Sequence, residues 1–170
     1  LTLLVLLPVY SERRSYLARN AVSINEDLKS LATESHDLTA LFETLKQLPP
    51  GRVYVGPARN FERDHWSYDY RVGNFSVDSL LLGEGLDMVG KIYHTYSLNS
   101  DVLIDFDEQR WDHYNLFNAR YVVAPEDQVF PEFVEPLQKF GRHQLYRVET
   151  TGYFDLVGSG LEFAGGRMDF

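Results

Sequence analysis

The sequence predicts an α/β fold, a small mixed sheet with flanking helices that follows an N-terminal helical segment leaving a membrane span. Helical periodicity fills residues 11–50, and from residue 51 onward short apolar runs bounded by proline and glycine alternate with helical patterns. The opening ten residues, LTLLVLLPVY, are almost wholly apolar. These observations divide the chain into an apolar N-terminal segment, a helical segment and an α/β domain, over residues 1–10, 11–50 and 51–170.

The apolar opening run has two interpretations. It is shorter than the roughly 18 residues that a membrane-crossing helix needs, and Pro8 interrupts it. As the last turns of a transmembrane helix, it would place Tyr10 at the membrane interface and Arg13 and Arg14 just outside. As a buried N-terminal strand it would belong to the sheet, and periodicity does not separate the two for so short a run. The missing initial methionine and the abrupt apolar start suggest a piece of a larger protein.

Composition excludes several classes of function. With 170 residues, 44% of them hydrophobic, the chain can bury the core of one domain. A net charge of -9 argues against nucleic acid as a partner, because binding phosphates requires lysine and arginine. The chain has no cysteine, which excludes disulfides, zinc–thiolate sites and thiol nucleophiles. Nothing in the sequence calls for a cofactor.

Two apolar stripes predict helices in the segment before residue 51. The first repeats every three or four residues and consists of Leu17, Ala21, Ile24, Leu28 and Leu31. The second consists of Leu38, Leu41, Phe42, Leu45 and Leu48. Asp37 is a candidate N-cap of the second stripe, and Pro49, Pro50 and Gly51 form a stop signal. The pattern therefore indicates two helices or one bent helix.

The rest of the chain predicts short elements in alternation. Buried or alternating runs predict strands over residues 52–56, 119–124, 143–149 and 153–157. Helical spacing predicts helices over residues 79–96, with three glycines inside, and over residues 111–118 and 131–140. Residues 102–106 fit either a strand or the end of a helix, and residues 57–73 fit a long loop.

One acidic motif could hold a metal ion. Asp105 and Asp107 follow an apolar run in an Asp-x-Asp pattern, and two such carboxylates can share a divalent cation that neutralises a diphosphate leaving group. The same residues also fit a solvated acidic turn. The five histidines have no spacing typical of metal ligands.

An aromatic and charged segment is the candidate glycan-binding surface. Aromatic faces flanked by carboxylates and guanidinium groups suit sugars, because the rings pack on C–H patches and the charged groups bind hydroxyls. The candidate residues are Trp66, Tyr68, Tyr70, Asp64, Asp69 and Arg71, with Trp66 and Tyr68 as stacking platforms and Asp64 and Asp69 as hydroxyl acceptors. Alternatively, the rings anchor a long loop onto the core.

Four segments carry a family resemblance. They are PVYSERRSYLARN, Leu48 to Tyr54, Leu116 to Val123, and the closing pair of Leu145 to Val148 with Gly152 to Asp155. Together they resemble the extracytoplasmic part of large bacterial multi-span membrane proteins, the YfhO-like and pyruvoyl-tetrahydropterin synthase-related groups. The membrane half of those proteins is similar to glycosyltransferases of the GT-C class.

The resemblance implies a non-catalytic extracytoplasmic domain at the cell membrane. Its partners would be the transmembrane part of the same polypeptide and a glycan or lipid-linked sugar. The catalytic carboxylates of GT-C proteins lie in the membrane half, so none is assigned in this chain. Two alternatives remain: a metal-dependent nucleotide-sugar transferase using Asp105 and Asp107, and a purely structural interaction module that self-associates through the apolar N-terminus.

Overall fold

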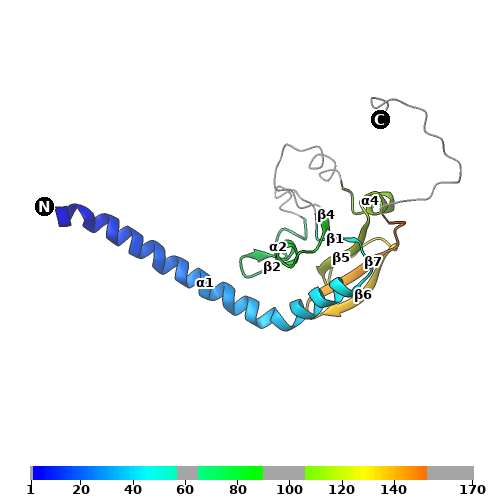
Figure 1. The fold of residues 1–170 in the computed structure, drawn as a ribbon, viewed down its shortest axis with the longest axis horizontal. Coiled ribbons are helices and arrows are strands. Elements are labelled where there is room, and N and C mark those ends of the chain that lie inside the picture. The colour runs from blue at the N-terminus through cyan, green and yellow to red at the C-terminus, as the bar shows by residue number, and fades with distance from the viewer. Residues whose placement is uncertain (1, 57–64, 90–105, 153–170) are drawn as a thin grey trace, which may run out of the picture.

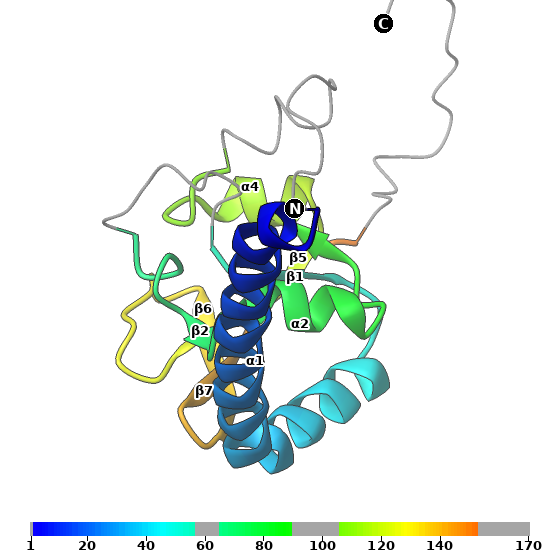
Figure 2. The same ribbon diagram turned by 90° about the vertical axis from the view of Figure 1, so that its left-hand side faces the viewer.

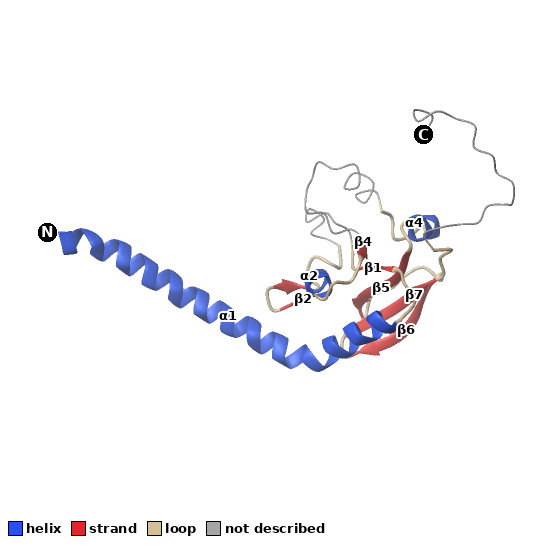
Figure 3. Cartoon of the chain, viewed as in Figure 1, coloured by secondary structure: helices blue, strands red, loops and turns tan. Residues whose placement is uncertain are grey.

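The computed structural model describes residues 2–56, 65–89 and 106–152, and it has the mixed α/β architecture that the sequence predicts. A long helix, α1 (Thr2–Gln47), leads into a compact domain whose sheet lies between helices (Figures 1 and 3). The first part of α1 projects away from the domain, and its last turns lie against the sheet. In the described part of the chain, no helix combines the length and the hydropathy that crossing a membrane requires.

Helix α1 is a single bent helix, one of the two arrangements that the apolar stripes allowed. The opening run is helical from Thr2, so the strand interpretation is wrong for residues 2–10. Figure 2 shows the last turns of α1 at a steep angle to the rest. Three side-chain hydroxyls between residues 30 and 35 bind backbone carbonyls of the preceding turn: Ser30 to Glu26, Thr33 to Lys29 and Ser35 to Ala32. Such back-bonding bends helices, and it accounts for the change of direction.

The main sheet has five strands in the order β4-β1-β5-β7-β6. Their bounds are β1 Arg52–Tyr54, β4 Met88–Val89, β5 Ala119–Pro125, β6 Val134–Phe140 and β7 His143–Val148. Strand β1 pairs in parallel with β4 and β5, whereas β7 pairs antiparallel with β5 and β6. The sheet is therefore mixed, and the predicted strands near residues 52, 119 and 143 are confirmed.

The predicted helix over residues 131–140 is wrong, because this segment forms β6. Its apolar residues fit a helical spacing, but the segment forms a seven-residue strand at the edge of the sheet, and six of its residues pair with β7 across a tight turn. The register shifts between Pro136 and Gln138, which leaves Leu137 as a bulge. Proline lacks the N–H that a central strand would need, so an edge strand with a bulge is where Pro136 is tolerated.

The predicted helix over residues 79–96 is wrong from residue 84 to residue 89, and residues 90–96 lie outside the described part of the chain. Helix α2 (Val77–Gly83) ends at the glycines, and β4 follows and pairs with β1. A two-stranded sheet of β2 (Arg71–Val72) and β3 (Phe75–Ser76) precedes α2. The predicted strand at residues 153–157 and most of the run at residues 102–106 lie outside the described residues.

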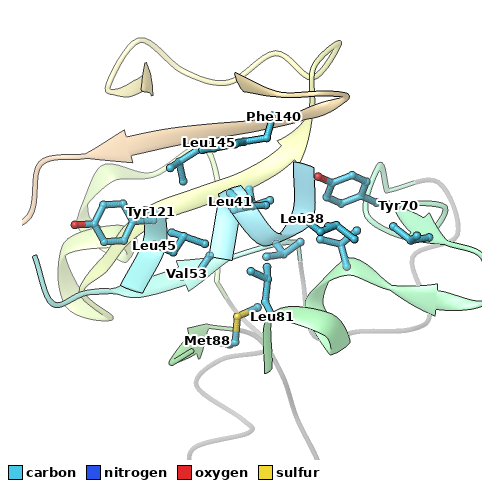
Figure 4. Packing of buried hydrophobic residues seen from close by; sticks show 14 residues of the cluster. Leu38, Leu41, Leu45, Val53, Tyr70, Leu81, Met88, Tyr121, Phe140 and Leu145 are labelled. Atoms are coloured by element: carbon cyan, nitrogen blue, oxygen red, sulfur yellow. The ribbon is translucent and has the colours of Figure 1, made fainter. Parts of the chain in front are cut away.

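The core has one apolar cluster on each face of the sheet. On one face, Leu38, Leu41 and Leu45 of α1 point toward strand residues that include Val53 and Leu145 (Figure 4). These three leucines are at most 5% exposed. On the other face, the cluster is rich in aromatic residues and includes Tyr114 of helix α4 (Trp111–Leu116). Burial of the three leucines on the first face holds the last turns of α1 against the sheet.

Asn118 turns the chain from α4 into β5. It has φ +48, the left-handed conformation that asparagine tolerates after the last helical residue. It is 1% exposed, its carbonyl accepts hydrogen bonds from the amides of Arg52 and Arg120, and its side-chain oxygen accepts one from Thr150. Asn118, which belongs to the Leu116 to Val123 segment, therefore serves to shape the turn of the backbone between α4 and β5.

Candidate functional site

The described part of the aromatic segment, residues 65–73, forms two consecutive turns and then β2. The amide of Tyr68 donates to the carbonyl of His65 over 3.0 Å, and the amide of Tyr70 donates to Ser67 over 3.3 Å. These turns place Trp66 and Tyr70 toward the core, whereas Tyr68 and Asp69 are exposed. Asp64, one of the predicted hydroxyl acceptors, lies outside the described residues.

Glu108 is the centre of a hydrogen-bonded cluster that sequence reasoning missed. Its Oε2 atom lies 3.1 Å from the hydroxyl of Tyr54, 3.2 Å from Nε2 of His65 and 3.2 Å from Nε1 of Trp66. Burial raises the pKa of Glu108, but the hydrogen bonds from His65, Trp66 and Tyr54 outweigh this effect and lower that pKa overall. Glu108 is therefore an ionised acceptor that links β1, the loop and the turn before α4.

The ionised state of Glu108 fixes the tautomer of His65. Because the carboxylate can only accept, Nε2 of His65 carries the proton, and Nδ1 accepts from the hydroxyl of Ser67 at 2.8 Å. The amide of Ser67 also donates to Nδ1, over 3.2 Å. A serine, a histidine and a glutamate thus stand in the order used by hydrolytic triads.

The packing around Ser67 indicates a structural role for this network. Gly56 has φ +96, and a Cβ atom there would overlap both Cβ and Oγ of Ser67. The backbone of Gly56 therefore packs closely against the Ser67 hydroxyl on one side. The network fixes the loop against the end of β1.

Trp66 is an anchor of the loop. Its ring centroid lies 6.5 Å from that of Tyr54, 6.0 Å from Tyr70 and 5.9 Å from Phe130, all in edge-on arrangements. It packs against the apolar clusters on both faces of the sheet, and Glu108 accepts its indole N–H. This geometry matches the interpretation that aromatic residues anchor a long loop onto the core.

Tyr70 joins a second buried network, which removes its ring from the candidate glycan-binding surface. It is 2% exposed, and its hydroxyl lies 2.6 Å from Nδ1 of His143. Nε2 of His143 lies 2.9 Å from a carboxylate oxygen of Glu34 on α1, which also accepts from Arg142 over 2.8 Å. Burial raises the pKa of Tyr70, and burial together with the charge of Arg142 lowers the pKa of His143.

Three predicted residues remain on the surface: Tyr68, Asp69 and Arg71. Tyr68 is 37% exposed, and the guanidinium carbon of Arg71 lies 5.9 Å from the centre of its ring. Arg71 also donates to the carbonyls of Tyr68 and Asn74, at 3.2 and 3.3 Å, so its position is fixed. One ring, one carboxylate and one guanidinium group make a small polar and aromatic patch, which we call the Tyr68 patch.

Asp107 belongs to a capped turn. Its Oδ1 atom accepts from the amide of Gln109 over 2.9 Å, and its own amide donates to Nδ1 of His113 over 2.9 Å. Its partner in the predicted metal site, Asp105, lies outside the described residues. Over residues 2–56, 65–89 and 106–152, no three His, Cys, Asp or Glu side chains are grouped to hold a metal ion.

A comparison of the chain with protein-family models, curated proteins and solved structures finds no match.

Proposed function

We propose that this chain is a non-catalytic, extracytoplasmic domain of a polytopic glycosyltransferase-like membrane protein. In this role α1 connects the domain to the transmembrane part of the same polypeptide, and the domain braces that part. The Tyr68 patch is the surface offered to a glycan acceptor or a lipid-linked sugar.

The geometry of α1 is the observation that carries the proposal. Its 46 residues extend over about 70 Å at 1.5 Å per residue, and only the last third packs into the core of the domain. The apolar run at residues 2–10 continues the same helix without a break. A continuous helix with one end buried in a folded domain holds that domain in a fixed position relative to whatever its other end is attached to. This is what a brace requires.

Two further features support the proposal. The buried polar networks around Glu108 and His143 are occupied by contacts between elements of the domain, which suits a structural role. The four sequence segments resemble extracytoplasmic parts of multi-span proteins, and this resemblance supports the extracytoplasmic location of the domain.

Protease accessibility tests the attachment. In cells that make the native full-length protein, we expect this domain to stay with the membrane pellet after an alkaline carbonate wash. Protease added to intact spheroplasts should cleave it, whereas protease added to inside-out vesicles should not. Release of the domain into the soluble fraction would overturn the proposal.

A glycan array probed with the 170-residue chain tests the Tyr68 patch separately. Binding should be lost in Tyr68→Ala and kept in Tyr16→Ala, a matched tyrosine that is 59% exposed on α1. Equal loss in both variants, or no binding by the unmodified chain, would remove the glycan from the proposal and leave the membrane attachment to the first test.

A further inference from the structure

The turn between β2 and β3, which consists of Gly73 and Asn74, lies against the middle of α1. Asp27 on the helix accepts from the backbone amide of Asn74 over 2.9 Å and from its side-chain amide over 3.2 Å. Ser23, one helical turn earlier, accepts from the same side-chain amide over 3.3 Å. Gly73 has φ +60, and a Cβ atom there would lie 2.7 Å from Oδ1 of Asp27 and 3.2 Å from its Cα. The backbone of the turn is therefore in close contact with the helix.

A second contact joins α1 to the same hairpin. Nε of Arg142 donates to the carboxylate of Glu34 over 2.8 Å, and the guanidinium group of Arg142 also donates to the carbonyl of Arg71 on β2. Arg142 itself lies in the turn between β6 and β7. Its side chain is thus a bridge that binds the helix at one end and the strand at the other.

Both contacts act on Arg71, the cationic residue of the Tyr68 patch. The carbonyl of Arg71 accepts from Arg142, and the guanidinium group of Arg71 donates to the carbonyl of Asn74 over 3.3 Å. The amide of that same Asn74 donates to Asp27. The guanidinium group also donates to the carbonyl of Tyr68 over 3.2 Å and lies over its ring. The arrangement of the patch therefore depends on contacts that α1 provides.

The contact at Asp27 can open without unfolding the domain. It consists of exposed hydrogen bonds, which water can replace. The buried leucines of α1, Leu38, Leu41 and Leu45, lie further along the helix. The bend over residues 30–35, where side-chain hydroxyls bind carbonyls of the helix, lies between these two regions. The part of α1 before the bend can thus move while the last turns stay packed.

We propose that α1 regulates the Tyr68 patch, with Asp27 as the positioning residue that couples the helix to it. When the first part of α1 lies on the β2–β3 turn, Arg71 is held beside Tyr68 and the patch can bind. When this part of the helix moves away, Asn74 is released and Arg71 loses a fixed acceptor. Binding at the patch and docking of α1 favour each other, because such coupling is reciprocal. The inference rests on the proposed function, in which the patch is offered to a glycan and α1 leads to the transmembrane part.

Exchange of the Arg71 Nε–H proton, followed by heteronuclear NMR of the 170-residue chain, tests the coupling. This proton is hydrogen-bonded to the carbonyl of Tyr68, so it should exchange several-fold faster in Asp27→Ala, which releases Asn74. The matched control is Glu26→Ala, which removes an exposed carboxylate from the same helix and should leave the rate unchanged. Backbone amides of β5 should exchange alike in both variants, because neither substituted residue belongs to the core clusters.

A glycine substitution opens the same contact from the other side. In Gly73→Ala the new Cβ competes for space with the carboxylate of Asp27, so exchange of the Arg71 Nε–H proton should again be several-fold faster. Gly85→Ala controls for the strain of a left-handed backbone. Gly85 has φ +77, and among the residues that the structure describes none lies within 4 Å of its Cβ position. This control should leave the Arg71 proton unchanged.

Binding to the glycan array is the second readout. Asp27→Ala and Gly73→Ala should bind several-fold more weakly than Glu26→Ala and Gly85→Ala. An unchanged Arg71 proton in the first two variants, or an equal change in the two controls, would overturn the inference. Faster exchange confined to the first two variants supports it even where the unmodified chain binds no glycan, an outcome that removes the glycan from the proposed function alone.

Discussion

Glu34 on α1 lies 2.9 Å from Nε2 of His143 on β7, a contact that joins the long helix to the sheet across 109 positions of the chain. His143 is completely buried and uses its other ring nitrogen for Tyr70. The direction in which α1 leaves the domain therefore depends on one carboxylate as well as on the leucines beneath the helix.

Removing that carboxylate should destabilise the domain. Glu34→Ala leaves a buried imidazole N–H without its acceptor and also frees Arg142, which should lower the free energy of unfolding by about 1–3 kcal/mol. Urea unfolding at neutral pH measures the change. Glu26→Ala, on the exposed side of the same helix, should stay within about 0.5 kcal/mol. Equal effects of the two substitutions would show that the hydrogen bond between His143 and Glu34 does not stabilise the domain.

The buried His143 should make stability depend on pH. Burial and the charge of Arg142 lower its pKa in the folded state, against the opposing effects of Glu34 and Asp37. As pH falls below about 6.5, the unfolded chain takes up a proton that the folded chain resists, and the free energy of unfolding falls by up to about 1.4 kcal/mol per pH unit. Above that pH the contribution is complete and constant.

Urea unfolding measured between pH 8 and pH 5 tests this prediction. The slope of the unfolding free energy against pH is compared between variants. His143→Gln should flatten the slope below pH 6.5, whereas His36→Gln, an exposed histidine on α1, should leave it unchanged. A slope that persists in His143→Gln would assign the effect to another group.

Trp66 should behave as a core residue. Its ring packs among Tyr54, Tyr70 and Phe130, so Trp66→Ala should cost about 2–4 kcal/mol of unfolding free energy, measured by urea titration. Tyr68→Ala, two residues along and 37% exposed, should cost less than about 1 kcal/mol. A stable Trp66→Ala variant would return the ring to the candidate glycan-binding surface.

Two glycine substitutions should have opposite signs. Gly141 has φ +56 in the turn between β6 and β7, and a Cβ there would press on the carboxylate of Asp37, so Gly141→Ala should destabilise by about 1–3 kcal/mol. Gly83, at the end of α2, has open space around its Cα, and Gly83→Ala should stabilise by about 0.5–1 kcal/mol. Thermal melting of the two variants measures both changes. An unchanged melting temperature for Gly141→Ala would show that the turn accommodates the added Cβ without loss of stability.

The sequence by itself determined the elements whose patterns are local. Apolar stripes at helical spacing specified α1, and buried runs between proline and glycine specified β1 and β5, because backbone propensity and one-sided burial both favour the same structure. It also identified the loop around Trp66 as a place where aromatic and charged residues gather, and anchoring as one of their two roles.

Only the tertiary structure decided the features that depend on distant partners. Residues 134–140 have helical spacing, yet pairing with β7 across Gly141 makes them a strand, because ladder hydrogen bonds outweigh a short stripe. Glu34, Tyr70 and His143 have no shared sequence pattern and meet only when α1 packs on the sheet. Glu108 likewise becomes a shared acceptor only where β1, the loop and α4 converge, since spatial neighbours and not sequence neighbours satisfy a buried charge.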